Sequence, residues 1–434
     1  MRSDDWPAFT VSEITSKGRN ALVGGPFGSD LVSKDYVPSG VPVIRGANMG
    51  KGRWVSGDFV FVSKEKADSL SANCAKPGDL VFTQRGTIGQ VALVPEAGFD
   101  RYLISQSQMK LSVDPDKVSG LFLFYVFCTT EQQNYIQQNA IRTGVPHTNL
   151  GILRNTPVRL PSLIKQNAIA SVLTAFDAKI ELNNRINAEL EGLAKLLYDY
   201  WFVQFDFPMT TAQAAALGKP HLAGHPYRAS GGKMIYNETL KREIPEGWEV
   251  KALDEICQSV RISVDPADVD PATPYVGLEH VPRCQFFLDA WESATSVKSL
   301  KSRFLKGDVL FGKLRPYFHK VVRVEMEGIC TSELLVLRSR HPKYEALLGS
   351  VVFSDQFVES TSKQWGGAQM PRADWNRMKK FQLPVPTDEL LKDFNAFVLP
   401  LWKLGGSNQQ QNQELTQLRD WLLPMLMNGQ VTVG

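Results

Sequence analysis

The sequence lacks the features that would place a protein in a membrane or direct it out of the cell. Its longest apolar run, residues 121–128, is far shorter than the roughly 20 residues that a membrane-spanning helix needs. Residues 1–5 contain no apolar stretch of the kind found in a signal peptide. Because 43% of the residues are apolar, the chain can still bury sizeable cores, and we expect a cytoplasmic globular protein.

Cysteine is scarce, and its pattern excludes two common uses. The five cysteines, at positions 74, 128, 257, 284 and 330, include no Cys-x-x-Cys pair. An odd, scattered set argues against a disulfide framework and against a zinc site, and it predicts buried thiols. His221 and His225 lie four residues apart, but Gly224 and Pro226 argue against a helix that would present both to one metal ion. No metal site is expected.

The motifs of nucleotide-binding and methyl-transferring enzymes are also missing. There is no G-x-x-x-x-G-K-[ST] loop, and residues 24–28 do not form the glycine fingerprint of a dinucleotide site. The segment nearest to an Asp/Asn-Pro-Pro-Tyr/Phe turn, residues 314–317, lacks the acceptor for amine protons. Glu65, Asp79 and Asp308 lie near lysines, as in metal-dependent nucleases, but neither half has a complete acid-acid-lysine set. We expect no catalysis, with a single-chain nuclease or methyltransferase as the alternative.

Charge of one sign is not in large excess. The formal net charge of +3 is too small to indicate nucleic-acid binding by itself. Residues 298–323, however, carry eight lysines and arginines against the single acid Asp308, with Tyr317, Phe318 and His319 interleaved. This segment predicts a local phosphate-facing surface, and an ordinary solvated face is the alternative.

What the sequence does contain is a duplication. Residues 76–82 return as 306–311, and residues 158–161 return as 381–384. Five further residues, Asn183, Asn187, Glu189, Leu190 and Leu193, have counterparts at one constant offset in Asn408, Asn412, Glu414, Leu415 and Leu418. The segments between these anchors differ, so two copies of one scaffold present two different faces.

Each copy has the pattern of an α+β domain that runs into a long amphipathic helix. Short strands bounded by glycine and proline fill the first domain, with one helix near residues 119–138, and apolar residues then recur at coiled-coil spacing. The predicted division is a globular domain at 1–161, a helix at 162–205, a poorly ordered connector at 206–246, a second globular domain at 247–385 and a second helix at 386–434.

Amide side chains interrupt the apolar seam of both helices near the middle. They are Asn183 and Asn187 in the first helix and Asn408, Gln411 and Asn412 in the second. If the helices lie antiparallel, these amides meet around an internal pseudo-twofold axis, and leucine at Asn183 and Asn187 should raise thermal stability while loosening register. Pro400 and the pair Gly405–Gly406 predict a kink or short interruption in the second helix.

In this order, the motifs of the chain resemble those of a known family, the specificity subunits of type I restriction-modification systems. The matching segments are 25–29, 40–45, the paired Gly-Asp motifs, 312–317, the Leu-Pro exits into both helices, and 230–233 followed by 244–248. The resemblance covers nearly the whole chain. It implies a non-catalytic DNA-recognition subunit in which two target recognition domains each recognise half of a split, asymmetric DNA site. The two helices would form an antiparallel coiled-coil spacer.

The resemblance also implies partners. These are double-stranded DNA, two methyltransferase subunits that dock on the chain, and restriction subunits that translocate and cut DNA. S-adenosylmethionine, ATP and magnesium would bind to those partners, so no cofactor is expected on this chain. A scaffold whose recognition domains have degenerated is a second alternative.

Recognition of bases requires forked donors or amides at base edges, and the divergent loops of the two copies supply them. The candidates in the first domain are Arg45, Asn48, Gln84, Arg85, Arg142, His147 and Asn149. The candidates in the second domain are Lys313, Arg315, Tyr317, Gln364, Trp365, Gln369 and Arg372. Gly144 and Gly367 align between the copies and place the later loops equivalently. For any one of these residues, an ordinary surface or core role is the alternative.

Overall fold

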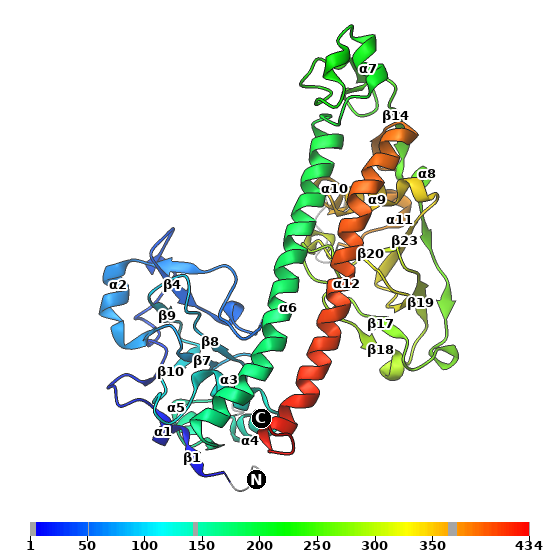
Figure 1. Ribbon diagram of the computed structural model, residues 1–434. Coiled ribbons are helices and arrows are strands. Elements are labelled where there is room, and N and C mark those ends of the chain that lie inside the picture. Colours follow the sequence, from blue (N-terminus) through cyan, green and yellow to red (C-terminus); the bar gives the residue numbers. More distant parts are fainter. Residues whose placement is uncertain (1–5, 51, 142–145, 363–370, 434) are drawn as a thin grey trace. The chain divides into compact units, whose positions relative to one another are not determined.

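The computed structural model describes residues 6–50, 52–141, 146–362 and 371–433 (Figure 1). The chain forms two compact units, Met1–Ile180 with Glu414–Gly434, and Glu181–Gln413. Each unit contains one globular domain and a segment of each of two long helices. Within the described ranges, no helix combines the length and the apolar character needed to cross a membrane.

Two small β-sheets form the first globular domain. Their strand orders are β2-β10-β7-β8 and β3-β5-β4-β9-β6, and β4 runs parallel to β9 whereas the other neighbours run antiparallel. The strands are β2 (Leu22–Gly24), β3 (Tyr36–Val37), β4 (Val41–Ile44), β5 (Val60–Val62), β6 (Cys74–Ala75), β7 (Leu80–Thr83), β8 (Val91–Leu93), β9 (Tyr102–Ile104) and β10 (Gln108–Leu111). Strands β7 to β10 are buried along their whole length, and β8 and β9 are accordingly apolar throughout.

Helices cover this domain at several points. They are α1 (Val11–Ile14), α2 (Lys64–Ser69), α3 (Gly120–Cys128), α4 (Thr130–Asn139) and α5 (Leu150–Arg154). The single helix expected near residues 119–138 is two helices, because Thr129 adopts an extended conformation (φ −68°, ψ 147°) and caps α4 through its side chain. The almost wholly apolar α3 is buried in the domain core.

The second globular domain repeats the smaller sheet and four strands of the larger one, which confirms the duplication; the fifth strand of the larger sheet, β16, lies at the opposite edge from β3. Its sheets have the orders β15-β23-β20-β21 and β16-β19-β22-β17-β18, again with one parallel pair, β17 and β22. The strands are β15 (Cys257–Val260), β16 (Ser263–Val264), β17 (Pro274–Val276), β18 (Glu292–Ser293), β19 (Lys301–Phe304), β20 (Val309–Gly312), β21 (Val321–Arg323), β22 (Gly328–Cys330) and β23 (Leu334–Ser339). The helices are α8 (Leu253–Ile256), α9 (Glu345–Phe353), α10 (Asp355–Ser362) and α11 (Trp375–Met378).

In both copies a strand near the start of the domain pairs with the strand that precedes the long helix. Strand β1 (Ala8–Thr10) pairs with β11 (Pro157–Arg159), and β14 (Glu249–Ala252) pairs with β24 (Gln382–Val385), both antiparallel. Each domain is therefore closed on itself before its chain enters the helix.

The repeated Gly-Asp motif is a structural turn. Gly78 and Gly307 have φ values of +85° and +90°, which favour glycine. In each turn the aspartate accepts a backbone N–H three residues earlier, at 2.8 Å for Asp79 and 2.7 Å for Asp308. Asp308 is also held by Arg338 through two bonds of 2.7 Å. These carboxylates are committed to the fold.

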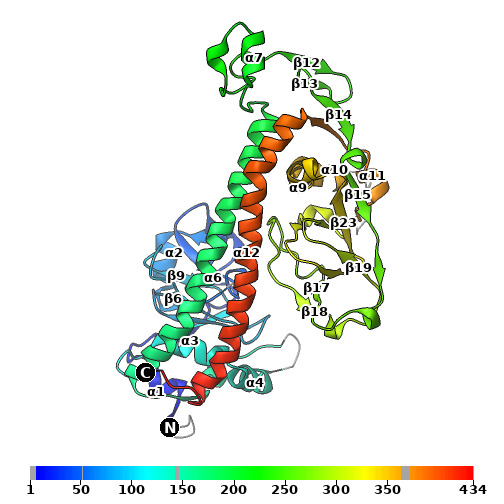
Figure 2. The ribbon, with the colours of Figure 1, turned by 45° about the vertical axis from the view of Figure 1, so that its right-hand side comes forward.

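The two long helices are α6 (Leu163–Tyr198), which continues as a π-helical turn over Asp199–Val203, and α12 (Asp388–Met427). Their first residues are separated by the same 225-residue offset as Asn183 and Asn408. Within each unit, the segments of α6 and α12 run antiparallel and side by side (Figures 1 and 2). The expected pair of antiparallel helices is confirmed.

The amide side chains meet in the second unit as predicted. Nδ2 of Asn183 donates to Oδ1 of Asn412 at 2.9 Å and to Gln411 at 2.8 Å. Nδ2 of Asn408 donates to Oδ1 of Asn187 at 2.8 Å. Exchanging the two copies exchanges the pair 183–412 with the pair 408–187, as a local pseudo-twofold axis requires.

The expected interruption of the second helix is wrong, since α12 is continuous through Pro400 and the glycine pair. A Cβ atom on Gly405 would lie 2.2 Å from the Phe287 ring, and one on Gly406 would lie 2.3 Å from Cγ of Glu325. The carbonyl of Gly405 also accepts a bond of 3.1 Å from Asn187. The glycines allow close packing against the second domain and do not end the helix.

The connector is folded, contrary to expectation. It contains α7 (Thr211–Ala216) and a hairpin of β12 (Met234–Asn237) and β13 (Arg242–Pro245) (Figure 1). The Phe207 ring stacks on Tyr227 at 4.7 Å and on Trp248 at 5.3 Å between ring centroids. This buried aromatic stack forms a small core for the segment. The high glycine, proline and alanine content had suggested that no such core exists. Among the cysteines, 74, 257 and 330 are buried as expected, whereas 128 and 284 are exposed.

Candidate DNA interface

In the first domain, the turn after β7 lies against the chain that leads into α5. The backbone N–H of Thr148 donates to the carbonyl of Gln84 at 3.0 Å, and Arg85 forms an isolated β-bridge with His147. The Arg85 side chain is exposed, whereas Gln84 and His147 are half-buried. The structure therefore brings three of the predicted residues together at one surface.

Arg45 adjoins this group through a shared turn. The turn at 105–107 donates an N–H to the carbonyl of Ile44 at 2.9 Å and accepts the N–H of Gln84 at 2.7 Å. Arg45 is half-buried, and its Nη2 donates to the carbonyl of Asp58 at 3.3 Å. One edge of its guanidinium is thus anchored close to the Gln84 turn.

Two predicted residues have structural roles. Asn48 is fully buried, and its amide is saturated by the backbone: Oδ1 accepts from Arg45 at 3.0 Å, and Nδ2 donates to Ser56 and Asp58 at 3.1 Å each. Asn48 therefore has no group available for a base, and its prediction does not fit the structure. Asn149 caps α5, with Oδ1 accepting the N–H of Ile152 at 2.9 Å, which leaves only its Nδ2 for another partner.

Phe27 is a surface residue of this group that was not predicted from the sequence. Its side chain is 84% exposed. Its loop is fixed to the 105–107 turn, because Gln106 donates to the carbonyls of Gly28 and Leu31 at 3.0 Å each. An exposed aromatic ring on a fixed loop can stack on a base or wedge between base pairs. The signal was an aromatic residue flanked by glycine and proline, with no apolar neighbour.

In the second domain, the loop after β20 lies along residues 371–373. The N–H of Arg315 donates to the carbonyl of Pro371, and the carbonyl of Lys313 accepts the N–H of Ala373, both at 2.8 Å. The Arg372 guanidinium donates to Glu333 at 2.6 Å, and half of its side-chain area remains exposed. Lys313, Arg315 and Arg372 are thus brought together, as predicted from their loops.

A constrained turn presents Tyr317 at this surface. Arg315 and His319, which flank the turn Pro316–Phe318, have φ values of +50° and +52°, a region that costs non-glycine residues about 1 kcal/mol each. A bond of 2.9 Å between Nε2 of His319 and the carbonyl of Phe353 fixes one end. Tyr317 at the centre remains 52% exposed. Strain held by such contacts is typical of binding sites.

The surface around this turn is electropositive. Burial, together with Arg261, lowers the pKa of Lys313, and burial, together with Arg283, lowers the pKa of Lys320. The Arg283 guanidinium also lies 3.6 Å from the centroid of the Phe318 ring. Crowded cations of this kind favour an anionic ligand such as a DNA phosphate. Arg261 and Arg283 were missed because they lie outside the basic segment.

The basic segment 298–323 is only partly a surface. Arg323 is 5% exposed and forms ion pairs with Glu325 and Glu345, and His319 is 8% exposed. These two residues support the domain and do not face a ligand. Four predicted residues, Arg142, Gln364, Trp365 and Gln369, lie outside the described residues. In the described part of the chain, no three His, Cys, Asp or Glu side chains converge as metal ligands would.

Comparison with known proteins places these observations in a family. The family described as "Type I restriction modification DNA specificity domain" matches residues 26–192. The MjaIX specificity subunit of Methanocaldococcus jannaschii is 23% identical, over 99% of this chain and 94% of that protein. Over nearly its whole length, the chain is similar to type I restriction-modification specificity subunits. The HindI specificity subunit of Haemophilus influenzae is a further relative, 23% identical over 82% of this chain and 87% of that protein.

The fold of a solved specificity subunit agrees with this assignment. The crystal structure of the type I restriction-modification S subunit from M. genitalium matches with a TM-score of 0.53 and 16% identity, over 97% of this chain and 96% of that one. The chain therefore has the fold of that S subunit.

Proposed function

We propose that this specificity subunit recognises a two-part, asymmetric DNA site, with one half bound by each globular domain. The observation that carries the proposal is that two domains of one topology present chemically different groups at equivalent loops. In the first domain these are Gln84, Arg85 and His147; in the second, Lys313 and the turn centred on Tyr317. Unlike groups on a duplicated scaffold suit two unlike half-sites.

The chain itself would not catalyse a reaction. The candidate carboxylates Asp79 and Asp308 are used in turns, and Asp79 also faces Lys110 at 3.8 Å. S-adenosylmethionine, ATP and magnesium would bind to partner subunits, in the cytoplasm where the DNA is. Purified chain incubated with DNA, magnesium and labelled S-adenosylmethionine should neither cut nor methylate; either activity would favour the enzyme alternative.

Two methyltransferase subunits would dock on the helices. Leu193 and its counterpart Leu418 are each 51% exposed, and Leu196 and its counterpart Trp421 are 63% and 60% exposed. Exposed apolar residues that recur at the duplication offset indicate two equivalent contact surfaces for one kind of partner. The proposed composition is two methyltransferase subunits for each chain, with restriction subunits added to that core.

The decisive experiment is to co-express the chain with its methyltransferase subunit in a host free of DNA methylation and to map modified bases across the genome. A single two-part motif with a fixed gap is expected. An assembled complex that methylates nothing would point to the scaffold alternative, in which the recognition domains have degenerated.

Replacing Arg315 by alanine should weaken binding to the cognate site by about 5- to 150-fold, or about 1–3 kcal/mol, and relax specificity at one base pair. Arg315 lies in the strained turn, and its Nε has no hydrogen-bond partner among the described residues. Fluorescence anisotropy on cognate and single-base-substituted duplexes measures both effects. Arg303→Ala, which removes an exposed arginine of the same basic segment, is the matched control. An equal loss on all sequences, with a shallower salt dependence, would make Arg315 a phosphate contact instead.

A further inference from the structure

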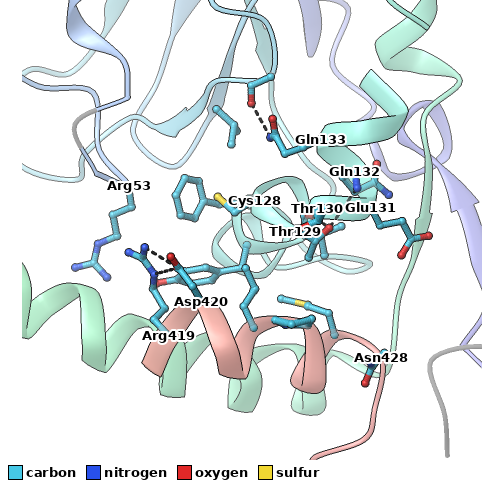
Figure 3. A pocket seen from close by; sticks show the side chains of 18 of the residues that line it. Arg53, Cys128, Thr129, Thr130, Glu131, Gln132, Gln133, Arg419, Asp420 and Asn428 are labelled. Carbon is cyan, nitrogen blue, oxygen red and sulfur yellow. Dashed lines mark hydrogen bonds and ion pairs between the residues drawn. The ribbon is translucent and has the colours of Figure 1, made fainter. Parts of the chain in front are cut away.

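Each unit contains a pocket between its domain and its helices, and the two pockets occupy equivalent places in the duplication. The pocket of the second unit, about 190 Å³, lies among α6, α9, the start of α10 and α12. The pocket of the first unit, about 850 Å³, lies among α3, α4 and the corresponding helix segments (Figure 3). Twelve of the fourteen residues that line the smaller pocket have their 225-residue counterparts in the wall of the larger one.

The two pockets differ in chemistry at three central positions. In the first unit, Asp177 accepts the Tyr125 hydroxyl and the Arg419 guanidinium, both at 2.6 Å. In the second unit the counterparts are Trp402, Ser350 and Ala194. In the larger pocket, Arg419 also pairs with Asp420 (Figure 3), so the charged groups at these positions pair with one another. The smaller pocket has no charged residue at the three corresponding positions.

One wall of the smaller pocket is a line of charged residues on α6 and its π-helical extension. Glu191, Lys195 and Asp199 are spaced by four residues, so they share one helix face. Lys195 forms an ion pair of 2.9 Å with Asp355 across the pocket. Glu191 accepts only a backbone N–H, that of Phe286 at 2.7 Å, and Asp199 has no ion-pair partner among the described residues. Burial raises the pKa of both carboxyl groups, although Lys195, whose ion pair is with Asp355, acts on both in the opposite direction.

The opposite walls are aromatic. The rings of Phe353 and Trp402 lie 4.9 and 4.8 Å from the ring of Phe286. Ser350, also in the wall, is 9% exposed, and its hydroxyl has no hydrogen-bond partner in the described structure. Aromatic faces, two uncompensated carboxylates and a free hydroxyl together suit a long side chain that ends in a cation.

We propose that this pocket receives a lysine or arginine side chain of the methyltransferase subunit that docks on the second unit. The proposal rests on the proposed function, because it takes its occupant from the partner assigned there. Charge complementarity selects the occupant: the lining residues Glu191, Lys195, Asp199 and Asp355 leave two negative charges in excess.

The test is to measure the affinity of the methyltransferase subunit for the full chain and for the double variant Glu191→Gln/Asp199→Asn. Glutamine keeps the oxygen that accepts from Phe286, so the fold is expected to remain intact. The variant should bind the partner at least about tenfold more weakly, with a shallower dependence on salt. The double variant Glu243→Gln/Asp268→Asn removes two exposed acids elsewhere on the same unit and should bind like the unchanged chain.

A second readout does not depend on substitution. Lys195 is half exposed in the free chain, so an amine-reactive reagent should modify it, and binding of the methyltransferase subunit should slow that modification severalfold. Unchanged affinity in the double variant, or unchanged reactivity of Lys195 in the complex, overturns the pocket proposal and leaves the proposed function standing. Failure of the unchanged chain to bind any methyltransferase subunit would instead overturn the proposed function.

Discussion

Replacing Asp177 by alanine should lower the free energy of unfolding of the first unit by about 3 kcal/mol. Its side chain is 9% exposed, and its two oxygens accept from Tyr125 and Arg419 at 2.6 Å each. Without the carboxylate, the buried Tyr125 hydroxyl loses its short ionic acceptor, and the guanidinium keeps only Asp420, which is 58% exposed. An unpaired buried group costs far more than a lost surface ion pair.

Hydrogen exchange at the amides of α3, measured in increasing urea, reports this change because α3 carries Tyr125 in the core of the first unit. Asp420→Ala is the matched control, since it removes the exposed acid that contacts the same arginine, and it should cost less than about 1 kcal/mol. If the two variants lose equal amounts, Asp177 does not act as a buried acceptor, and the pocket chemistry inferred for the first unit loses its basis.

The sequence predicted those parts of the fold whose signal is local and repeated. The constant offset located both long helices, and the family resemblance implied that they run antiparallel. The amides at 183, 187, 408 and 412 were expected to meet in such an arrangement, and their hydrogen bonds confirm it. The repeated Gly-Asp turn was visible because a positive φ at glycine restricts the residue type wherever the turn occurs. Periodicity and backbone restriction act over a few residues, so they can be recognised without the rest of the chain.

Features that depend on distant parts of the chain could not be predicted in the same way. Gly405 and Gly406 have the signature of a helix break, but the ring of Phe287 and the side chain of Glu325 need the space that they leave. The connector likewise conceals its core, because Tyr227 and Trp248 come together only when the chain has folded back. Tertiary packing overrides local propensity in both cases.

The candidate site shows the same limit. Asn48 and Asn149 are polar loop residues. Such a residue looks the same in the sequence whether its side chain contacts a base or hydrogen-bonds to the backbone. Only the hydrogen bonds distinguish the two roles. Arg283 joins the residues around Tyr317 in the second domain because it stacks on Phe318, which lies 35 positions later in the chain. Base contacts themselves also depend on the shape of the DNA, which no sequence of the protein contains.

Replacing Asn183 and Asn187 by leucine should lower the free energy of unfolding of the second unit by about 3 kcal/mol. The sequence alone predicted an increase, since leucine suits an apolar seam. The structure reverses the sign, because Asn408 donates to Asn187, and Asn412 accepts from Asn183. Both asparagines of α6 are at most 4% exposed, and their substitution would take those bonds from the buried Asn412 and the half-buried Asn408 on α12.

Adding leucine at Asn408 and Asn412 should restore the lost free energy and exceed the unchanged chain, because none of the four bonded asparagines then remains without its partner and apolar contacts replace four polar groups. Thermal unfolding of the double and the quadruple variant, followed by circular dichroism at the helical signal, compares the two. The hydrogen-bonded amides thus specify which residues of α6 and α12 face each other. Their cost in stability appears only when all four asparagines are replaced. If the double variant melts at a higher temperature than the unchanged chain, the amides left on α12 have found other partners. The two leucines would then raise thermal stability, as expected from the sequence.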